Sequence, residues 1–201
     1  MTKKQDLNNQ SNSAFVSVLY SNHEDDSSTV VEVRISNGEM QISTDNRTTN
    51  DNHVVEHNRY SMGNICAQDV MKHIGGENYE KMLARIQELF HEETAATDLI
   101  SFLQFHHVGA NNPKPEQYRD AKFSAQAHQD KLCFSWHEEM VDPNGLYACV
   151  TESVDHIDAE SVRYAFGTQN CEEMCQILEK VVKTHNGYCN LINLLRDNGI
   201  I

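Results

Sequence analysis

A histidine and glutamate motif is the most chemically suggestive string in this 201-residue chain. His53, Glu56 and His57 have the spacing His-x-x-Glu-His, which on a helix places two imidazoles around one zinc ion and leaves the carboxylate as a base. Glu138 or Glu139 could supply the third ligand that a zinc site needs. The motif therefore predicts a metal hydrolase as one function class. The residues between and beside the motif are poor helix formers, however, so a solvated polar loop is the competing interpretation.

A second candidate site pairs a thiol with a histidine. Gly63-Asn64-Ile65 predict a turn that enters a helix at Cys66, and a helix N-terminus lowers the pKa of a thiol. His137 follows an expected strand and could accept the thiol proton, and Asp142 or Asn144 could orient the imidazole. The order of helix thiol, strand histidine and polar residue resembles that of papain-like cysteine hydrolases. The resemblance implies a cysteine hydrolase or acyl transferase, although alanine follows Cys66 where the family often has an aromatic residue.

Ordinary structural roles compete with this chemistry. Free cysteine is among the most buried residue types, so Cys66 is also expected as a small apolar residue on the inner face of a helix. The pairs His106-His107 and Cys171/Cys175 lack a matching second pair of metal ligands. We find no glycine-rich phosphate loop and no internal repeat, so nucleotide binding and a repeat architecture are not predicted.

Net charge restricts the class of partner. Sixteen Lys and Arg stand against 30 Asp and Glu, which gives a formal charge of -14. Such a charge repels phosphate backbones and anionic lipid and favours basic proteins. We therefore expect no direct nucleic-acid binding. Because the sequence holds no glycine-rich phosphate loop and no complete set of metal ligands, we also expect no cofactor and no metal. The leading prediction is an acidic protein-protein interaction module without catalysis, such as an inhibitor, immunity-type protein, adaptor or translocated bacterial effector.

Composition also predicts the division of the chain. Residues 1–13 are polar and predict a disordered tail, while residues 14–201 suffice for a single globular domain. The two lysines near the N-terminus precede no apolar run, so a signal peptide is not predicted, and no stretch is apolar enough to span a membrane. The six cysteines are then expected to be reduced in a cytoplasmic protein.

Local patterns predict an α+β fold. Strands at 15–20, 29–35 and 40–42, joined at Asn37-Gly38 by a tight turn, predict an N-terminal three-stranded meander. A flexible polar loop is expected over 43–58.

A β-hairpin and about six helices are predicted after that loop. The hairpin is expected over 132–136 and 146–150. Helices are expected over 64–74, 78–91, 97–108, 116–129 and 158–166, followed by a C-terminal helical pair over 171–196 that Asn186-Gly187 divides. We expect the helices to pack mainly on one face of a single mixed or antiparallel sheet.

Overall fold

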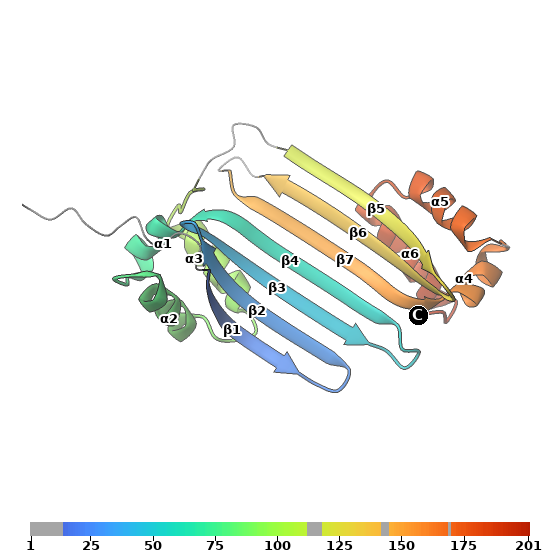
Figure 1. Cartoon of the computed structure of the whole chain (residues 1–201), viewed down its shortest axis with the longest axis horizontal. Coiled ribbons are helices and arrows are strands. Elements are labelled where there is room, and N and C mark those ends of the chain that lie inside the picture. Colours follow the sequence, from blue (N-terminus) through green and yellow to red (C-terminus); the bar gives the residue numbers. More distant parts are fainter. Residues whose placement is uncertain (1–13, 112–117, 142–144, 169) are drawn as a thin grey trace, which may run out of the picture.

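The computed structural model describes residues 14–111, 118–141, 145–168 and 170–201, and within them the chain forms one antiparallel sheet and six helices. This confirms the predicted α+β class; the tail expected over 1–13 lies outside the described residues. The strand order in the seven-stranded sheet is β1-β2-β3-β4-β7-β6-β5 (Figure 1). The strands are β1 Phe15–His23, β2 Ser27–Ser36, β3 Glu39–Thr49, β4 Val55–Cys66, β5 Tyr118–His128, β6 Lys131–Val141 and β7 Tyr147–Asp158.

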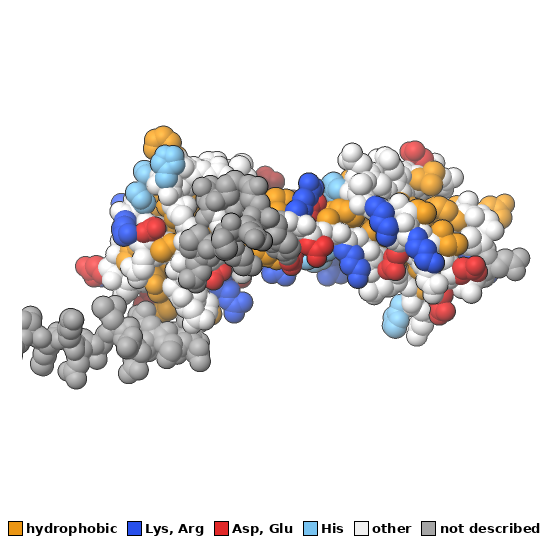
Figure 2. Space-filling view, turned by 90° about the horizontal axis from the view of Figure 1, so that it is seen from above, with side chains coloured by type: hydrophobic (Ala, Val, Ile, Leu, Met, Phe, Trp, Pro, Cys, Tyr) orange, Lys and Arg blue, Asp and Glu red, His pale blue; other side chains and the backbone are white. Residues whose placement is uncertain are grey.

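The helices gather in two groups at opposite ends of the sheet, with α1 to α3 at one end and α4 to α6 at the other (Figure 1). Each group covers its own apolar core, and from above the molecule shows two lobes joined by a narrower waist (Figure 2). The helices are α1 Ala67–Ile74, α2 Tyr79–Leu89, α3 Ala95–Phe105, α4 Ala159–Phe166, α5 Cys171–Val181 and α6 His185–Asp197.

Both cores lie on the same face of the sheet. Ile42 of the first core pairs with Met62, and Met62 pairs with Ala148 of β7. Side chains alternate along a strand, so Ala148 and Val154 of the second core point to the same side. We call this side the helix face. The described helices leave the opposite side uncovered, and we call it the open face; its central residues are Asp45, His57, Arg59, His137, Cys149 and Thr151.

Asparagine caps and apolar stripes explain where two of the helices begin. The Asn78 side chain accepts a hydrogen bond from the Lys81 amide, and the Asn170 side chain accepts from the amides of Glu172 and Glu173. Residues at helical spacing behind each cap are buried: Met82, Leu83 and Ile86 in α2, and Met174, Cys175 and Leu178 in α5. Both helices therefore start within one residue of the predicted positions, 78 and 171.

The chain contains two copies of one unit, each made of three strands followed by three helices. β6, β7, α4 and α5 each begin and end 92 residues after β3, β4, α1 and α2, as residue 159 follows residue 67. Backbone bonds repeat as well, because the Ala67 amide donates to Gly38 and the Ala159 amide donates to Asp130. We call residues 27–109 the first unit and residues 118–201 the second unit; β1 is an additional edge strand.

The expectation of no internal repeat is therefore wrong. Identical apolar pairs at this spacing are Ile65/Ile157, Ala67/Ala159, Val70/Val162, Met82/Met174, Leu99/Leu191, Ile100/Ile192 and Leu103/Leu195. These residues fill helix faces and cores, where unrelated proteins also place apolar residues. Turn positions keep the same left-handed backbone with different residues, at Asn37/Gln129, Asn64/His156 and His107/Gly199. The copies thus share a backbone while their sequences have little in common.

Three segments differ from their predicted secondary structure, the shortest being residues 64–66, which end β4 and do not begin the helix predicted over 64–74. The polar stretch 43–58 forms the paired ends of β3 and β4, and only residues 50–54 connect them. These strand ends extend beyond the first core, so they carry polar residues on both faces and have the composition of a loop. Of the helix predicted over 116–129, residues 118–128 form the edge strand β5, in which pairing with β6 overrides helix propensity.

The boundary between the last two helices also differs. α5 ends at Val181, before the predicted stop at Asn186-Gly187. Gly187 lies in the first turn of α6, where its amide donates to the Thr184 side chain. The threonine cap outweighs the turn preference of the Asn-Gly pair.

The two cores are expected to unfold as one unit, because nine residue pairs of the β4–β7 ladder join them. Met82→Ala removes a fully buried side chain from the first core and should destabilise the protein by about 2–5 kcal/mol. Trp136, the single tryptophan, lies in the second core and reports on it alone. In urea, the Trp136 fluorescence midpoint should fall together with the far-UV circular dichroism midpoint. A fluorescence midpoint unchanged by Met82→Ala would show that the cores unfold independently.

Candidate functional site

Polar side chains meet in two clusters on the open face, one on each side of the centre of the sheet. Arg59 of β4 pairs with Thr151 of β7 at the point where the two units meet. The first cluster lies on β3 and β4, and the second lies on β6 and β7. Strand pairing brings these residues together, because Asp45 and His57 lie 12 residues apart in the sequence, as do His137 and Cys149.

The first cluster joins a histidine to a carboxylate. Nε2 of His57 lies 2.9 Å from Oδ1 of Asp45, so the imidazole donates to the carboxylate. The pair borders a hollow of about 820 Å³, which also reaches Cys133 and Asp155 across the sheet. This volume is in the range of small-ligand sites. Charged residues in its lining are the carboxylates Asp45, Asp130 and Asp155 and the cations Arg47 and Lys131.

The thiol that borders this hollow, Cys133, has a raised pKa. Burial, together with a hydrogen bond to Asp155, raises the pKa of Cys133 to about 12. The thiol form therefore predominates at neutral pH, and only the thiolate is a good nucleophile. Cys133 serves as a neutral wall of the hollow.

The second cluster combines a histidine, a thiol and a carboxylate. Nε2 of His137 lies 3.2 Å from Oε1 of Glu139, and a carboxylate only accepts, so this nitrogen carries the proton. In the neutral imidazole Nδ1 is then an acceptor; it lies 2.9 Å from the Thr151 hydroxyl oxygen and 3.9 Å from the Cys149 sulfur. Burial and a hydrogen bond to Glu139 raise the pKa of the neighbouring Tyr147. The imidazole thus has the proton arrangement of a base that faces a thiol.

Equivalent positions of the two units carry these clusters. His137 follows Asp45 by 92 residues, and Cys149 follows His57 by the same interval. The duplicated backbone therefore presents polar side chains at matching points of the open face, with different chemistry at each.

Cys66 and His137, paired in the sequence prediction, are not brought together. Cys66 precedes α1 and hydrogen-bonds to Asp69, whose carboxyl pKa is lowered mainly by Lys72. It lies seven residues along β4 from Arg59, and His137 lies two strands beyond Arg59. At about 3.3 Å per residue the two side chains are more than about 20 Å apart. Cys149 takes the place beside His137, while Asp142 and Asn144 lie outside the described residues.

The His-x-x-Glu-His motif does not form a helical zinc site. His53 occupies a turn with φ of 59°, and β4 then places Glu56 and His57 on opposite faces of the sheet. Glu56 accepts two hydrogen bonds of 2.7 Å from Arg196 on the helix face.

The proposed third ligand is also separated from the motif. Glu138 is buried against Arg119 on the helix face, whereas Glu139 belongs to the second open-face cluster. Neighbouring side chains of a strand point to opposite faces, so the extended backbone keeps apart the motif residues that a helix would have placed on one side.

Comparison of the chain with protein-family models, with curated proteins and with solved structures found no match. Among the described residues, no helix has both the length and the apolar character required to cross a membrane.

Cys133 is expected to react slowly with iodoacetamide at pH 8, because less than about 0.1% of a thiol with a pKa near 12 is ionised there. Asp155→Asn removes the nearby negative charge and should raise the alkylation rate of Cys133 severalfold. The rates can be read from peptide mass spectra of the intact fold. An unchanged rate in Asp155→Asn would contradict the assigned contact, and Cys66 serves as the internal reference.

Proposed function

We propose that the chain is a non-catalytic interaction module that binds a partner protein with a basic surface through the open face. The observation that carries this proposal is that both helix groups lie on one side of the sheet, so the described helices leave a broad polar face uncovered. Inhibitors, immunity-type proteins, adaptors and translocated bacterial effectors are the kinds of protein that work in this way.

The side chains of the open face suit contact with another protein. Serine pairs recur at equivalent points of the two units, Ser43 beside Ser61 and Ser135 beside Ser153. Ser61 is buried, whereas the partly exposed hydroxyls of Ser43, Ser135 and Ser153 can exchange hydrogen bonds with a partner. The hollow beside them offers room for side chains of the partner.

Charge supports a basic partner. The hollow carries three carboxylates against two cations, and the whole chain carries -14. Further carboxylates, of Glu24, Asp25, Asp26 and Asp51, lie in the β1–β2 and β3–β4 turns, which are linked by the Thr49 amide donating to Asp26. A negative surface accelerates association with a positive partner and disfavours partners of its own sign.

A peptide library with graded lysine and arginine content tests this proposal. The wild-type chain should enrich basic peptides, and Asp45→Asn with Asp155→Asn should weaken their binding by roughly tenfold or more. Glu172→Gln with Glu173→Gln changes the charge equally on α5, away from the open face, and should leave most of the binding intact. Equal losses in the two double variants, or no preference for basic peptides, would refute binding at the open face.

A second candidate function rests on the contact between Cys149 and His137. Nδ1 of His137 could take the thiol proton as the sulfur bonds to an acyl carbon, and the proton would then pass to the leaving group. Glu139 holds the other nitrogen, as the third member of such a triad does. This is the cysteine hydrolase or acyl transferase hypothesis with Cys149 as the nucleophile in place of Cys66.

The acyl-transfer hypothesis predicts a burst of nitrophenol, one per chain, on mixing with p-nitrophenyl acetate. Cys149→Ala should abolish the burst, and His137→Ala should slow it by roughly 10²–10⁴-fold. Cys66→Ala is the matched control and should keep the burst. A burst that survives Cys149→Ala, or no burst in the wild-type chain, would exclude this chemistry.

A further inference from the structure

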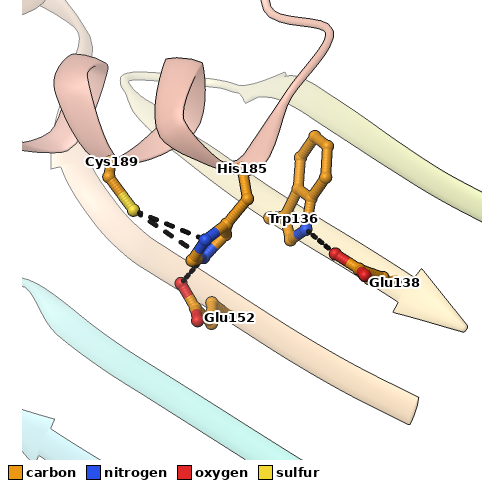
Figure 3. A network of polar contacts seen from close by, with 5 residues as sticks. All are labelled: Trp136, Glu138, Glu152, His185 and Cys189. Carbon is orange, nitrogen blue, oxygen red and sulfur yellow. Dashed lines mark hydrogen bonds and ion pairs between the residues drawn. The ribbon is translucent and has the colours of Figure 1, made fainter. Parts of the chain in front are cut away.

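A cluster on the helix face, separate from the open face, joins the start of α6 to β7. His185 and Cys189 are four residues apart and therefore share one side of α6, and Glu152 projects toward them from β7 (Figure 3). Oε2 of Glu152 lies 3.0 Å from Nε2 of His185, and the Cys189 sulfur lies 3.7 Å from the same nitrogen. One imidazole nitrogen thus lies next to a carboxylate and a thiol.

We propose that Glu152, His185 and Cys189 bind a single zinc ion. Zinc prefers tetrahedral sites of imidazole, thiolate and carboxylate ligands, with bonds of about 2.0–2.3 Å. Neighbouring ligands in such a tetrahedron are then about 3.3–3.6 Å apart. The two separations from Nε2, 3.0 and 3.7 Å, bracket this range, and all three donor atoms lie within 4.8 Å of one another. The ion would take the place of the proton on Nε2 and of the thiol proton.

The open-face cluster fits one metal ion less well. There, Glu139 contacts Nε2 of His137 while Cys149 lies nearest Nδ1, so the two donors meet different edges of the ring. At the helix-face cluster, Nε2 of His185 is the ring nitrogen nearest to both other donors, at 3.0 Å from Glu152 and 3.7 Å from Cys189, whose sulfur also lies 3.9 Å from Nδ1. The helix-face cluster therefore suits a single ion better than the open-face cluster does.

Neighbouring side chains support the position of His185. The ring centroids of Trp136 and Tyr188 lie 5.9 and 6.2 Å from the centroid of the imidazole, one on β6 and one on α6. Trp136 is itself fixed in the second core and donates to the buried carboxylate of Glu138. Packing of this kind limits the rotamers of a ligand, which favours metal affinity.

The cluster belongs to the second unit alone. Tyr60, Glu93 and Thr97 stand 92 residues before Glu152, His185 and Cys189, and they offer no comparable ligand set. The first residue of α3, Ala95, corresponds to Gly187 in the second unit. α6 begins two residues before Gly187, so His185 belongs to the helix. The shared fold does not require this ligand set, which supports a role specific to the second unit.

The fourth coordination position has space beside it. A hollow of about 320 Å³ is lined by Glu152 and Cys189 together with Asn58, Tyr188 and Arg196. Three protein ligands and one accessible position are the pattern of zinc sites that hold a water molecule or an exchangeable ligand. Arg196 at the hollow is already paired with the Glu56 carboxylate, which lines the same hollow, so a neutral ligand such as water suits the fourth position.

Zinc and cobalt(II) titration of the metal-free full-length chain tests the proposal. The wild-type protein should bind one equivalent, and cobalt should produce the charge-transfer absorption of thiolate coordination. Cys189→Ser should remove that absorption, and Glu152→Gln should weaken zinc binding by roughly tenfold or more. Trp136 fluorescence and circular dichroism check that each variant is folded.

Matched substitutions in the open-face cluster provide the control. Cys149→Ser and His137→Ala should leave the stoichiometry, the affinity and the thiolate absorption unchanged. Failure of the wild-type chain to bind one equivalent at micromolar protein concentration would overturn the proposal. Binding that is lost in Cys149→Ser but kept in Cys189→Ser would do so as well.

Discussion

The antiparallel pairing of β4 with β7 is the interaction on which the rest of the structure depends. It runs from Val55 opposite Asp155 to Gly63 opposite Tyr147 and joins two units into one sheet. Without this ladder each unit would present an extra unpaired edge, which is a template for aggregation. The edges that remain are contacted from equivalent helical positions: Gln87 donates to Val18 of β1, and Glu179 accepts from Ala125 of β5.

The two units thus share one backbone arrangement but carry different polar side chains at equivalent positions. The open face carries Asp45 with His57 in the first unit and His137 with Cys149 in the second. On the helix face, only the second unit carries the ligand set around His185. Backbone bonds and core positions keep the geometry constant, so surface side chains can change without loss of the fold.

Helices were predicted better than strands or sites. The apolar stripes that follow Asn78 and Asn170 are local signals, and they located α2 and α5. β5 and the polar ends of β3 and β4 depend on partners remote in the sequence, so local propensity missed them. The same reason explains the sites, because Cys66 looked reactive from its neighbours whereas register placed Cys149 beside His137.

The sequence by itself determined the α+β class, the starts of α2 and α5 and the acidic net charge, because these follow from composition and from residues a few positions apart. Only the tertiary structure decided which side chains meet. Strand register put Glu56 and His57 on opposite faces, and the packing of α6 on the sheet brought Cys189 to Glu152. Contacts between distant segments depend on how the chain pairs and packs as a whole, which no short stretch of sequence encodes.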